Sequence, residues 1–396
     1  MNKVLYIILI FLFTLTILSC DKDEPFYSDP FTDTTAPVIA EVIIVTTPTN
    51  DSTPDYTFSS DEAGIITYGG SCSSGTTSAT SGNNTITLVS LSDGTYSNCT
   101  IIVTDSAGNA SSALSVSTFV VDTTAPSVSS FTLSDTALIT GDNATVTLVF
   151  SEAVASFSSS ADITVANGTL AVMTSTDNIT WAGTFTPTAN TEDDNNTLSL
   201  ATSYTDTAGN TGPAATTLNY VVDTTAPTVS SISTTADNQS LVSITDNITV
   251  TFSKAIEPSY VTTSTSDTNC AGSIRVSSDN FSTCVKMSSE PVSSNSNRTF
   301  TLDPYDNLTF GPTYLTRVTT GVKDTAGNAL SSQYETTNGF TTAESISISS
   351  SASDNATVAF GQTYQYQLNT GGTYSDTITY SLSNEPANMT ISSSGL

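Results

Sequence analysis

The pentapeptide Asp33-Thr34-Thr35-Ala36-Pro37 recurs twice further along the chain, at Asp122–Pro126 and Asp223–Pro227. A second pentapeptide, Asp-x-Ala-Gly-Asn, alternates with it at Asp105–Asn109, Asp206–Asn210 and Asp324–Asn328. Two motifs in a fixed order and phase mark an internal repeat. We therefore predict three repeated units, at residues 33–121, 122–222 and 223–343, followed by a remainder at 344–396.

Each unit has the sequence pattern of β-strands. Residues 144–150 and 247–252 alternate apolar and polar side chains, which is typical of strands with one buried face. Residues 96–103 and 115–121 are rich in β-branched and aromatic residues, and clusters of Gly, Asn, Asp and Ser separate such runs. No stretch after residue 20 shows helical periodicity. The pattern predicts an all-β chain of tandem immunoglobulin-like β-sandwiches in a linear array.

These motifs resemble the linkers and loops of bacterial Ig-like domains, which are found in surface proteins and adhesins. The third unit resembles the SbsA-type Ig-like domain, named after an S-layer protein, in the segments Ala226–Val229, Val250–Lys254 and Val322–Leu330 and at Tyr314. The remainder, 344–396, resembles the opening of a putative-Ig (He-PIG) domain, and we expect this fourth domain to be incomplete. The resemblance implies architecture and a surface location but no particular ligand.

The first twenty residues predict the compartment. Lys3 precedes an almost unbroken apolar run, Val4–Leu18, which has the length of a signal-peptide core and is short for a transmembrane helix. The sequence Ile17-Leu18-Ser19-Cys20 resembles the lipobox of bacterial lipoproteins, which implies that residues 1–19 are removed and that Cys20 is acylated. Several acyl chains together anchor a protein stably. The alternative is an uncleaved anchor with an incidental cysteine.

Residues 20–32 form a polar tether that begins with Asp21-Lys22-Asp23-Glu24. This run resembles the Lys-acidic-acidic export signal of surface lipoproteins in the Bacteroidetes group. We therefore predict a lipid-anchored protein of the cell envelope, at the outer membrane and cell surface. Asp21 leaves open the alternative of retention at the inner membrane.

The composition excludes several classes of function. The 396 residues contain 8 Lys+Arg, 37 Asp+Glu and no His, for a formal net charge of −29. Nucleic-acid binding needs clustered cations to neutralise phosphates, so we predict no nucleic-acid partner. Without His, the chain has neither Ser-His-Asp nor Cys-His catalysis and no His-ligated metal site. No phosphate-binding Gly-rich loop is present either, so we predict that the chain is not an enzyme.

Four cysteines remain beside Cys20, and four cysteines allow three pairings. Pairing within units, Cys72 with Cys99 and Cys270 with Cys284, is the only arrangement that does not tie separate sandwiches together. Export to an oxidising compartment favours such disulfides. The alternative is free buried thiols. Two aromatic residues also have predicted roles: Tyr96 as a tyrosine corner near the start of a strand, and Trp181 as a core side chain, with a sugar-binding platform as the alternative for Trp181.

Acidic residues recur at one end of each predicted sandwich, where the N-terminus and two loops gather. The predicted sets are Asp33, Asp61, Glu62 and Asp105 in the first unit; Asp122, Glu152 and Asp206 in the second; and Asp223, Glu257 and Asp324 in the third, where Lys254 intrudes. Such carboxylates repel one another unless a cation lies among them, and Ca²⁺ accepts six to eight oxygens. Resemblance to bacterial Ig-like adhesins implies calcium at these junctions, with a weaker case where Lys254 supplies positive charge. The alternative is that each Asp satisfies only its own turn.

Other acidic residues carry no predicted chemistry. Glu192-Asp193-Asp194 predicts a polar turn, because nothing opposes these carboxylates across a cleft as glycoside cleavage requires. Apart from calcium, we predict no cofactor.

We therefore predict a non-catalytic cell-envelope lipoprotein with a structural or adhesive role. Its Ig-like units would form a semi-rigid stalk, because the proline in each linker restricts the backbone. Its partners would be the membrane, through the lipid anchor, and a surface glycan or protein. The alternative is the N-terminal stalk of a larger secreted enzyme or glycan-binding protein whose working module lies beyond residue 396. A substrate-binding lipoprotein of a transporter is excluded, since such proteins are two-lobed α/β folds.

Overall fold

The computed structural model describes residues 33–233, 235–344, 347–348, 370–371 and 390. The predicted signal peptide, Cys20 and the tether lie outside the described residues, as does nearly all of the predicted fourth domain. The chain divides into two compact units, Met1–Thr123 and Thr124–Leu396. Among the described residues, no helix is long and apolar enough to span a membrane. The described residues are almost entirely strand and turn, as predicted.

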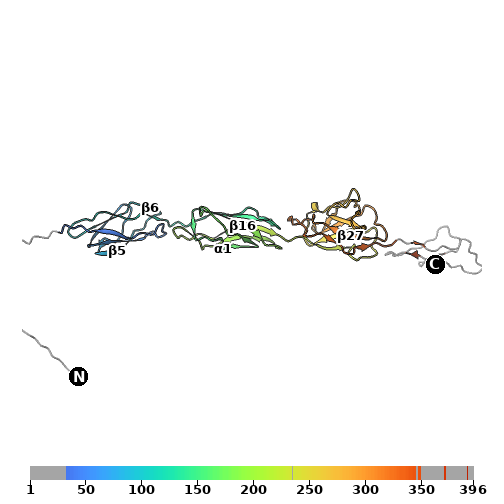
Figure 1. Cartoon of the computed structure of the whole chain (residues 1–396), viewed down its shortest axis with the longest axis horizontal. Helices are drawn as coiled ribbons and strands as arrows, with labels where there is room; N and C mark the ends of the chain where they lie inside the picture. Colours follow the sequence, from blue (N-terminus) through green and yellow to red (C-terminus); the bar gives the residue numbers. More distant parts are fainter. Residues whose placement is uncertain (1–32, 234, 345–346, 349–369, 372–389, 391–396) are drawn as a thin grey trace, which may run out of the picture. The chain divides into compact units, whose positions relative to one another are not determined.

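The first domain, in the first compact unit, is drawn in blue to cyan in Figure 1. Its sheets are β1-β2-β5, β4-β3-β7-β8 and the pair β6-β9. They enclose one apolar core that includes Tyr56, Phe58, Ile86, Val103 and Phe119. The strands are β1 (Ile39–Ile43), β2 (Asp55–Ser60), β3 (Gly64–Gly69), β4 (Ser78–Ala79), β5 (Gly82–Thr87), β6 (Gly94–Tyr96), β7 (Thr100–Thr104), β8 (Leu114–Ser115) and β9 (Phe119–Val121).

Two predicted strands of this domain are each divided in the structure. Residues 96–103 form parts of β6 and β7, and residues 115–121 form parts of β8 and β9. The reason is that the chain changes sheets within each run. Tyr96 pairs with Phe119 in one sheet, whereas Thr100 pairs with Ser115 in another. The residues between β6 and β7 carry Cys99, which is buried on the same side as Ile101 and Val103, as its strand phase predicts.

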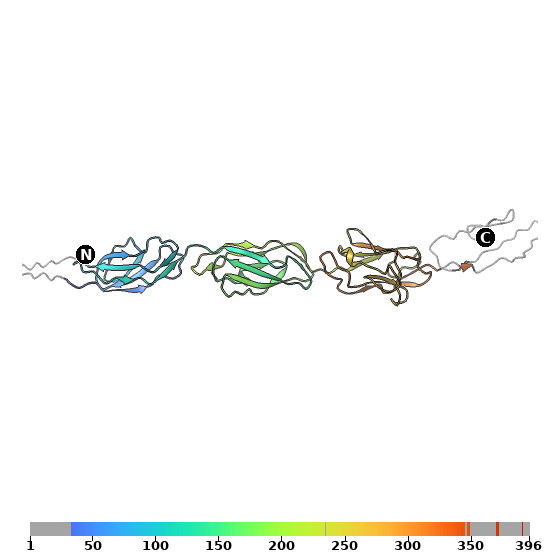
Figure 2. The same cartoon turned by 90° about the horizontal axis from the view of Figure 1, so that it is seen from above.

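The second domain begins the second compact unit, and Figure 2 shows its strands running along its length. Strand β12 (Ala144–Phe150) has the predicted bounds, and its alternate residues Ala144, Val146, Leu148 and Phe150 are buried. The sheets are β10-β12-β16-β15, β11-β21-β17, β14-β18-β20 and β13-β19. The other elements are β10 (Val128–Leu133), β11 (Ala137–Ile139), β13 (Val154–Ala155), α1 (Ser159–Asp162), β14 (Ile163–Val165), β15 (Gly168–Leu170), β16 (Thr180–Pro187), β17 (Glu192–Asn196), β18 (Leu198–Leu200), β19 (Thr205–Asp206), β20 (Ala215–Thr216) and β21 (Tyr220–Asp223).

The predicted turn at residues 192–194 is wrong, because these residues open strand β17. This strand lies at the edge of its sheet and pairs with β21, with Glu192 opposite Asp223. Charged side chains are tolerated on edge strands, where they also discourage pairing with other chains. Trp181 packs on the core as predicted, with its ring centroid 4.8 Å from that of Phe157.

The third domain also lies in the second compact unit. Its main sheets are β22-β23-β26-β25 and β24-β27-β28, and β29 pairs with β27. The core includes Phe252, Ile274, Phe300, Tyr314 and Phe340. The elements are β22 (Val229–Ser233), β23 (Ile248–Phe252), the 3₁₀-helix η1 (Pro258–Tyr260), β24 (Ile274–Ser277), β25 (Val292–Ser294), β26 (Thr299–Leu302), β27 (Thr313–Val318), β28 (Tyr334–Glu335) and β29 (Phe340–Thr341). Beyond it, β30 (Ser347–Ile348) pairs with β31 (Thr370–Gly371).

Both predicted disulfides are present. Cys72–Cys99 lies in the first domain with a Cα–Cα distance of 5.2 Å, and Cys270–Cys284 lies in the third domain with a distance of 5.0 Å. Each bond therefore closes a loop within one domain, as the within-unit pairing predicted. The tyrosine corner is also confirmed, since the Tyr96 hydroxyl donates to the Ser92 carbonyl oxygen at 2.8 Å.

Candidate functional site

The Asp-x-Ala-Gly-Asn motif is a loop that its aspartate closes on itself. In the first domain, Asp105 Oδ1 accepts the backbone N–H groups of Ala107 at 2.9 Å and Asn109 at 2.8 Å. The Asn109 side-chain amide donates to Asp105 Oδ2 at 2.8 Å. Gly108 has a φ of 95°, a conformation that glycine adopts without strain. Asp105 therefore accepts the backbone hydrogen bonds of its own turn through Oδ1 and a side-chain amide through Oδ2.

The other two copies of the motif have the same internal bonds. Asp206 Oδ1 accepts the N–H groups of Ala208 and Asn210, at 2.8 and 2.9 Å. Asp324 Oδ1 accepts those of Ala326 and Asn328, at 3.1 and 2.8 Å. Asp206 and Asp324 are buried. Burial is tolerated because several donors solvate each carboxylate within the loop.

The asparagine of the motif joins this loop to the start of its own domain. Asn109 Nδ2 donates to the backbone oxygen of Asp33 at 2.9 Å, and Asn328 Nδ2 donates to that of Asp223 at 2.8 Å. The two recurrent pentapeptides therefore meet at one end of the first and third domains. This contact explains why both motifs recur in phase.

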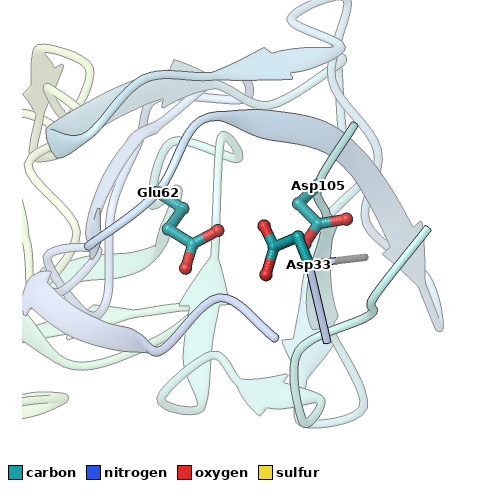
Figure 3. Close-up of side chains that lie close together, drawn as sticks. All are labelled: Asp33, Glu62 and Asp105. Atoms are coloured by element: carbon teal, nitrogen blue, oxygen red, sulfur yellow. The ribbon is translucent and has the colours of Figure 1, made fainter. Parts of the chain in front are cut away.

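Three carboxylates of the first domain come together beside this contact. Ligand oxygens of Asp33, Glu62 and Asp105 lie within 4.8 Å of one another. Figure 3 shows the side chains of Glu62 and Asp33 pointing toward each other, with Asp105 beside Asp33. Two oxygens bound to one Ca²⁺ at about 2.3–2.6 Å lie at most about 5 Å apart. The all-oxygen donor set and its spacing fit a calcium ion.

The electrostatics of this cluster are unfavourable for Glu62. Partial desolvation raises the pKa of Glu62 above its usual value. The negative charges of Asp33, Asp61 and Asp105 raise it further. The side-chain amide of Asn109, with backbone donors of the loop, instead holds the pKa of Asp105 below its usual range, although burial opposes this. A cation among the three carboxylates would relieve the repulsion that Glu62 experiences.

Asp61 lies outside this group. Its Oδ1 accepts the backbone N–H of Val38 at 2.7 Å, so it fixes the chain that leads into β1. In the second predicted set, Asp122 belongs to the first compact unit, whereas Glu152 and Asp206 belong to the second. A metal site at that set stays a prediction.

In the third domain, a lysine ammonium lies among the predicted carboxylates. Lys254 Nζ is 2.6 Å from Asp223 Oδ1 and 3.2 Å from Asp324 Oδ2. It also donates to the Thr225 backbone oxygen at 3.0 Å. Burial lowers the pKa of Lys254, but the hydrogen bonds to Asp223, Asp324 and Glu192 outweigh it and hold this pKa above the usual value. Lys254 supplies positive charge here, as predicted.

The third set differs from the prediction in one member. Glu257 is not in contact with Lys254; its Oε1 accepts the Ser259 hydroxyl at 3.2 Å. Glu192 of the second domain lies beside Lys254 instead, with its Oε2 at 3.2 Å from Nζ. Sequence reasoning missed Glu192, because its contact with Lys254 depends on the pairing of two strands. In the pairing of β17 with β21, Glu192 lies opposite Asp223, which begins the third unit.

The first and third domains differ at one equivalent position. Glu62 follows β2 by two residues, and Lys254 follows β23 by two residues. These strands occupy corresponding places, since each follows the first strand of its domain in the sheet order. One domain thus has a third carboxylate where the other has an ammonium group.

Three family models match the chain, and each is described as a bacterial Ig-like domain. They match residues 46–123, 122–222 and 223–342, which together are about three quarters of the chain. Domains of this type are typically non-catalytic. A comparison with curated proteins finds no match.

Several solved structures are similar to this chain. The N-terminal part of the bacterial S-layer protein SbsC is 24% identical, with a TM-score of 0.21 over 31% of this chain. This chain spans 26% of that protein chain. FdeC, an Escherichia coli adhesin, is 12% identical with a TM-score of 0.31, covering 77% of this chain and 97% of that one.

A third similar structure is SGBP-B of the Bacteroides ovatus mixed-linkage glucan utilization locus, in complex with a mixed-linkage heptasaccharide. It is 16% identical, with a TM-score of 0.16, covering 81% of this chain and 72% of that one. At these identities the likeness concerns the fold alone. The three family matches place this chain among the proteins built of tandem bacterial Ig-like domains.

Proposed function

We propose that this protein is a non-catalytic component of the bacterial cell surface, anchored by lipid at Cys20, whose tandem Ig-like domains serve a structural or adhesive role. The observation that carries the proposal is that each domain completes its own apolar core and closes its own acidic loop. In the first and third domains, the recurrent motifs bond to each other rather than line a cleft. Their polar groups are therefore engaged in structure.

The surface chemistry supports a role outside the cell. The first two domains contain no Lys or Arg, and their carboxylates keep the surface negative and discourage self-association. The two disulfides fit an oxidising environment. A protein of this kind meets its partner, a glycan or another protein, through its exposed surface.

The anchor is tested in the full chain by Cys20→Ala, with Ser28→Ala in the tether as control. The proposal expects the Cys20→Ala protein in the soluble fraction and the control protein in the membrane fraction. Cells that display the full chain are then compared with cells lacking it for attachment to glycan-coated and protein-coated surfaces. Unchanged membrane association of Cys20→Ala, or equal attachment of both cell types to every surface, would contradict the proposal.

The alternative function is a stalk that carries a glycan-binding or enzymatic module after residue 396. The pairing of β30 with β31 supports continued strand structure beyond the third domain. The sequence of the full gene distinguishes the two functions. Further Ig-like repeats favour the structural or adhesive role, whereas a hydrolase or lectin module favours the stalk.

We also propose that the carboxylates of the first domain bind calcium. Support comes from the spacing of Asp33, Glu62 and Asp105 and from the raised pKa of Glu62. It comes further from the third domain, in which Lys254 places a positive charge at the equivalent position. Bound Ca²⁺ would neutralise the cluster and hold the first residues of the domain against its acidic loop.

A further inference from the structure

Between residues 33 and 344, positively charged side chains are confined to one domain. The six cationic side chains between residues 33 and 344 all belong to the third domain: Lys254, Arg275, Lys286, Arg298, Arg317 and Lys323. Lys254 is engaged with carboxylates, and Arg317 Nε is bonded to Glu335 Oε2 at 2.8 Å. The remaining cations make the third domain the part of the described chain that can attract an anion.

A shallow hollow of about 290 Å³ lies on this domain between η1, the start of β24 and the end of β27. Exposed Tyr260 forms one wall, with 43% of its surface accessible. The rest of the lining consists of small and hydroxyl-bearing residues: Ser259, Thr262, Gly272, Ser273, Thr319 and Gly321. None of these lining residues carries a carboxylate.

Two cations flank the hollow. Lys323 Nζ lies 5.0 Å from the centroid of the Tyr260 ring. Arg275 Nε donates to the backbone oxygen of Gly272, a lining residue, at 3.0 Å. Within the described part of the chain, the terminal amino groups of Arg275 have no hydrogen-bond partner. An arginine with free donors beside a pocket is suited to bind a carboxylate in a bidentate manner.

The arrangement of Arg275 is electrostatically unfavourable without an anion. Arg275 lies directly opposite Arg317 in the pairing of β24 with β27, and like charges in opposed positions destabilise a sheet. The positive charge of Arg317 is compensated by the carboxylate of Glu335. The Cζ atom of Arg317 also lies 3.6 Å from the centroid of the Phe281 ring. Within residues 235–344, Arg275 has no comparable acidic or aromatic partner, so an anionic ligand in the hollow would supply the compensating charge.

We propose that this hollow binds an acidic sugar, a uronic acid residue of a polysaccharide. The apolar face of a sugar ring would pack on Tyr260, whose ring has an apolar body and a polar tip. Its hydroxyls would exchange hydrogen bonds with the Ser and Thr side chains, and its carboxylate would pair with Arg275 and Lys323. The inference rests on the proposed adhesive role, for which it names the ligand class and the site.

One carboxylate at the rim of the hollow, that of Glu257, allows the charge of the ligand to be tested. Glu257 accepts the Ser259 hydroxyl at 3.2 Å and its backbone N–H donates to the Lys323 carbonyl oxygen at 3.0 Å. Its charge opposes the approach of an anion. Glu257→Gln is therefore expected to strengthen binding, whereas a site for a cationic or neutral ligand would not respond in this way.

The experiment measures calorimetric binding of tetragalacturonate to the full chain, with maltotetraose as the neutral probe. Tyr260→Ala, Arg275→Gln and Lys323→Gln are each expected to weaken binding about tenfold, the loss of one charge-assisted or aromatic contact. The matched controls are Tyr305→Ala and Lys286→Gln, since Lys286 Nζ lies 3.9 Å from the Tyr305 ring on the same domain but away from the hollow. These controls are expected to bind as the unchanged protein does. Raised salt weakens the interaction.

Several results would overturn the proposal: no binding of tetragalacturonate, equal binding of maltotetraose, or an equal loss in the Tyr305→Ala control. Unaltered thermal unfolding of each variant excludes misfolding as the cause of a loss. If cells still attach to surfaces through this protein while Tyr260→Ala and Arg275→Gln have no effect, the acidic-sugar site is wrong and the adhesive role stands. If attachment itself is absent, the adhesive role fails instead.

Discussion

The ammonium nitrogen of Lys254 lies 2.6 Å from one carboxylate oxygen of Asp223 and 2.7 Å from the other. The first domain has Glu62 at the equivalent position, and its three carboxylates have no ammonium group of this kind among them. The two domains therefore present one loop arrangement in two charge states. This difference makes the role of the cation testable within one chain.

Lys254→Met is expected to destabilise the second compact unit by about 3 kcal/mol, because it leaves the buried Asp324 and the largely buried Asp223 without a positive partner. Urea unfolding of the full chain, followed by tryptophan fluorescence and circular dichroism, measures the change. Lys286→Met serves as control, since its ammonium contacts the exposed ring of Tyr305, and should cost under about 0.5 kcal/mol. Equal effects of the two variants would show that Lys254 contributes only surface charge.

Calcium is expected to raise the unfolding temperature of the first domain, because an ion that binds only the folded state stabilises it. At a hundredfold excess over the dissociation constant the gain is about 2.7 kcal/mol. Glu62→Lys should abolish this response while keeping the domain folded, since its ammonium would take the place of the ion as Lys254 does in the third domain. Calorimetry with calcium and with chelator measures the response, and Asp51→Asn, outside the carboxylate cluster, is the control. A calcium response that survives in Glu62→Lys contradicts the site.

The acid sensitivity of the third domain is expected to depend on Asp279. Hydrogen bonds from the Thr283 hydroxyl and backbone N–H, and from the Ser277 hydroxyl, lower the pKa of Asp279 from 3.8 to about 2. Because the folded-state pKa is depressed, the contribution to stability is present above pH 3.8 and is lost as the pH falls through about 2. Asp279→Asn should therefore flatten the dependence of stability on pH in this window. Unfolding temperatures at a series of pH values between 2 and 5 measure this dependence. If the unfolding temperature of the variant falls with pH as steeply as that of the unchanged protein, other carboxylates cause the loss of stability in acid.

Removal of either disulfide is expected to cost roughly 3 kcal/mol, because the crosslink restricts the unfolded chain. The loop closed by Cys72–Cys99 is longer than that closed by Cys270–Cys284, with sequence separations of 27 and 14, so its removal should cost slightly more. The double variants Cys72→Ala/Cys99→Ala and Cys270→Ala/Cys284→Ala are compared by denaturant unfolding. Each loss should appear only in the domain that holds the bond, and a loss in both domains would speak against independent folding.

The repeated motifs and the alternating strands were accessible from the sequence, since both depend on local order. Residues 144–150 form β12 because every second side chain meets one core. The change of sheet after Tyr96 was not accessible, because it depends on which partners β6 and β7 find elsewhere in the domain. Strand β17 was missed for the same reason, as its charges are typical of turns and only its place at a sheet edge accommodates them.

The candidate sites likewise include residues that could be predicted from the sequence and residues that could not. Asp33, Glu62 and Asp105 were grouped from the general arrangement of loops in a sandwich, and the structure brings them together. Glu192 could not be grouped with Lys254, because it reaches this lysine from the preceding domain. The hollow beside Tyr260 likewise arises where three separate segments meet, and no single stretch of sequence reveals it.

The absence of Lys and Arg between Lys22 and Lys254 has a consequence for resistance to proteolysis. Between Lys22 and Lys254 no peptide bond follows a basic residue, so trypsin-like proteases have no bond to cut in the first two domains, even when these domains unfold. Amine-reactive crosslinkers and dyes likewise find no lysine there. Digestion by such a protease should release the first two domains as one intact acidic fragment, which makes them the durable part of the molecule.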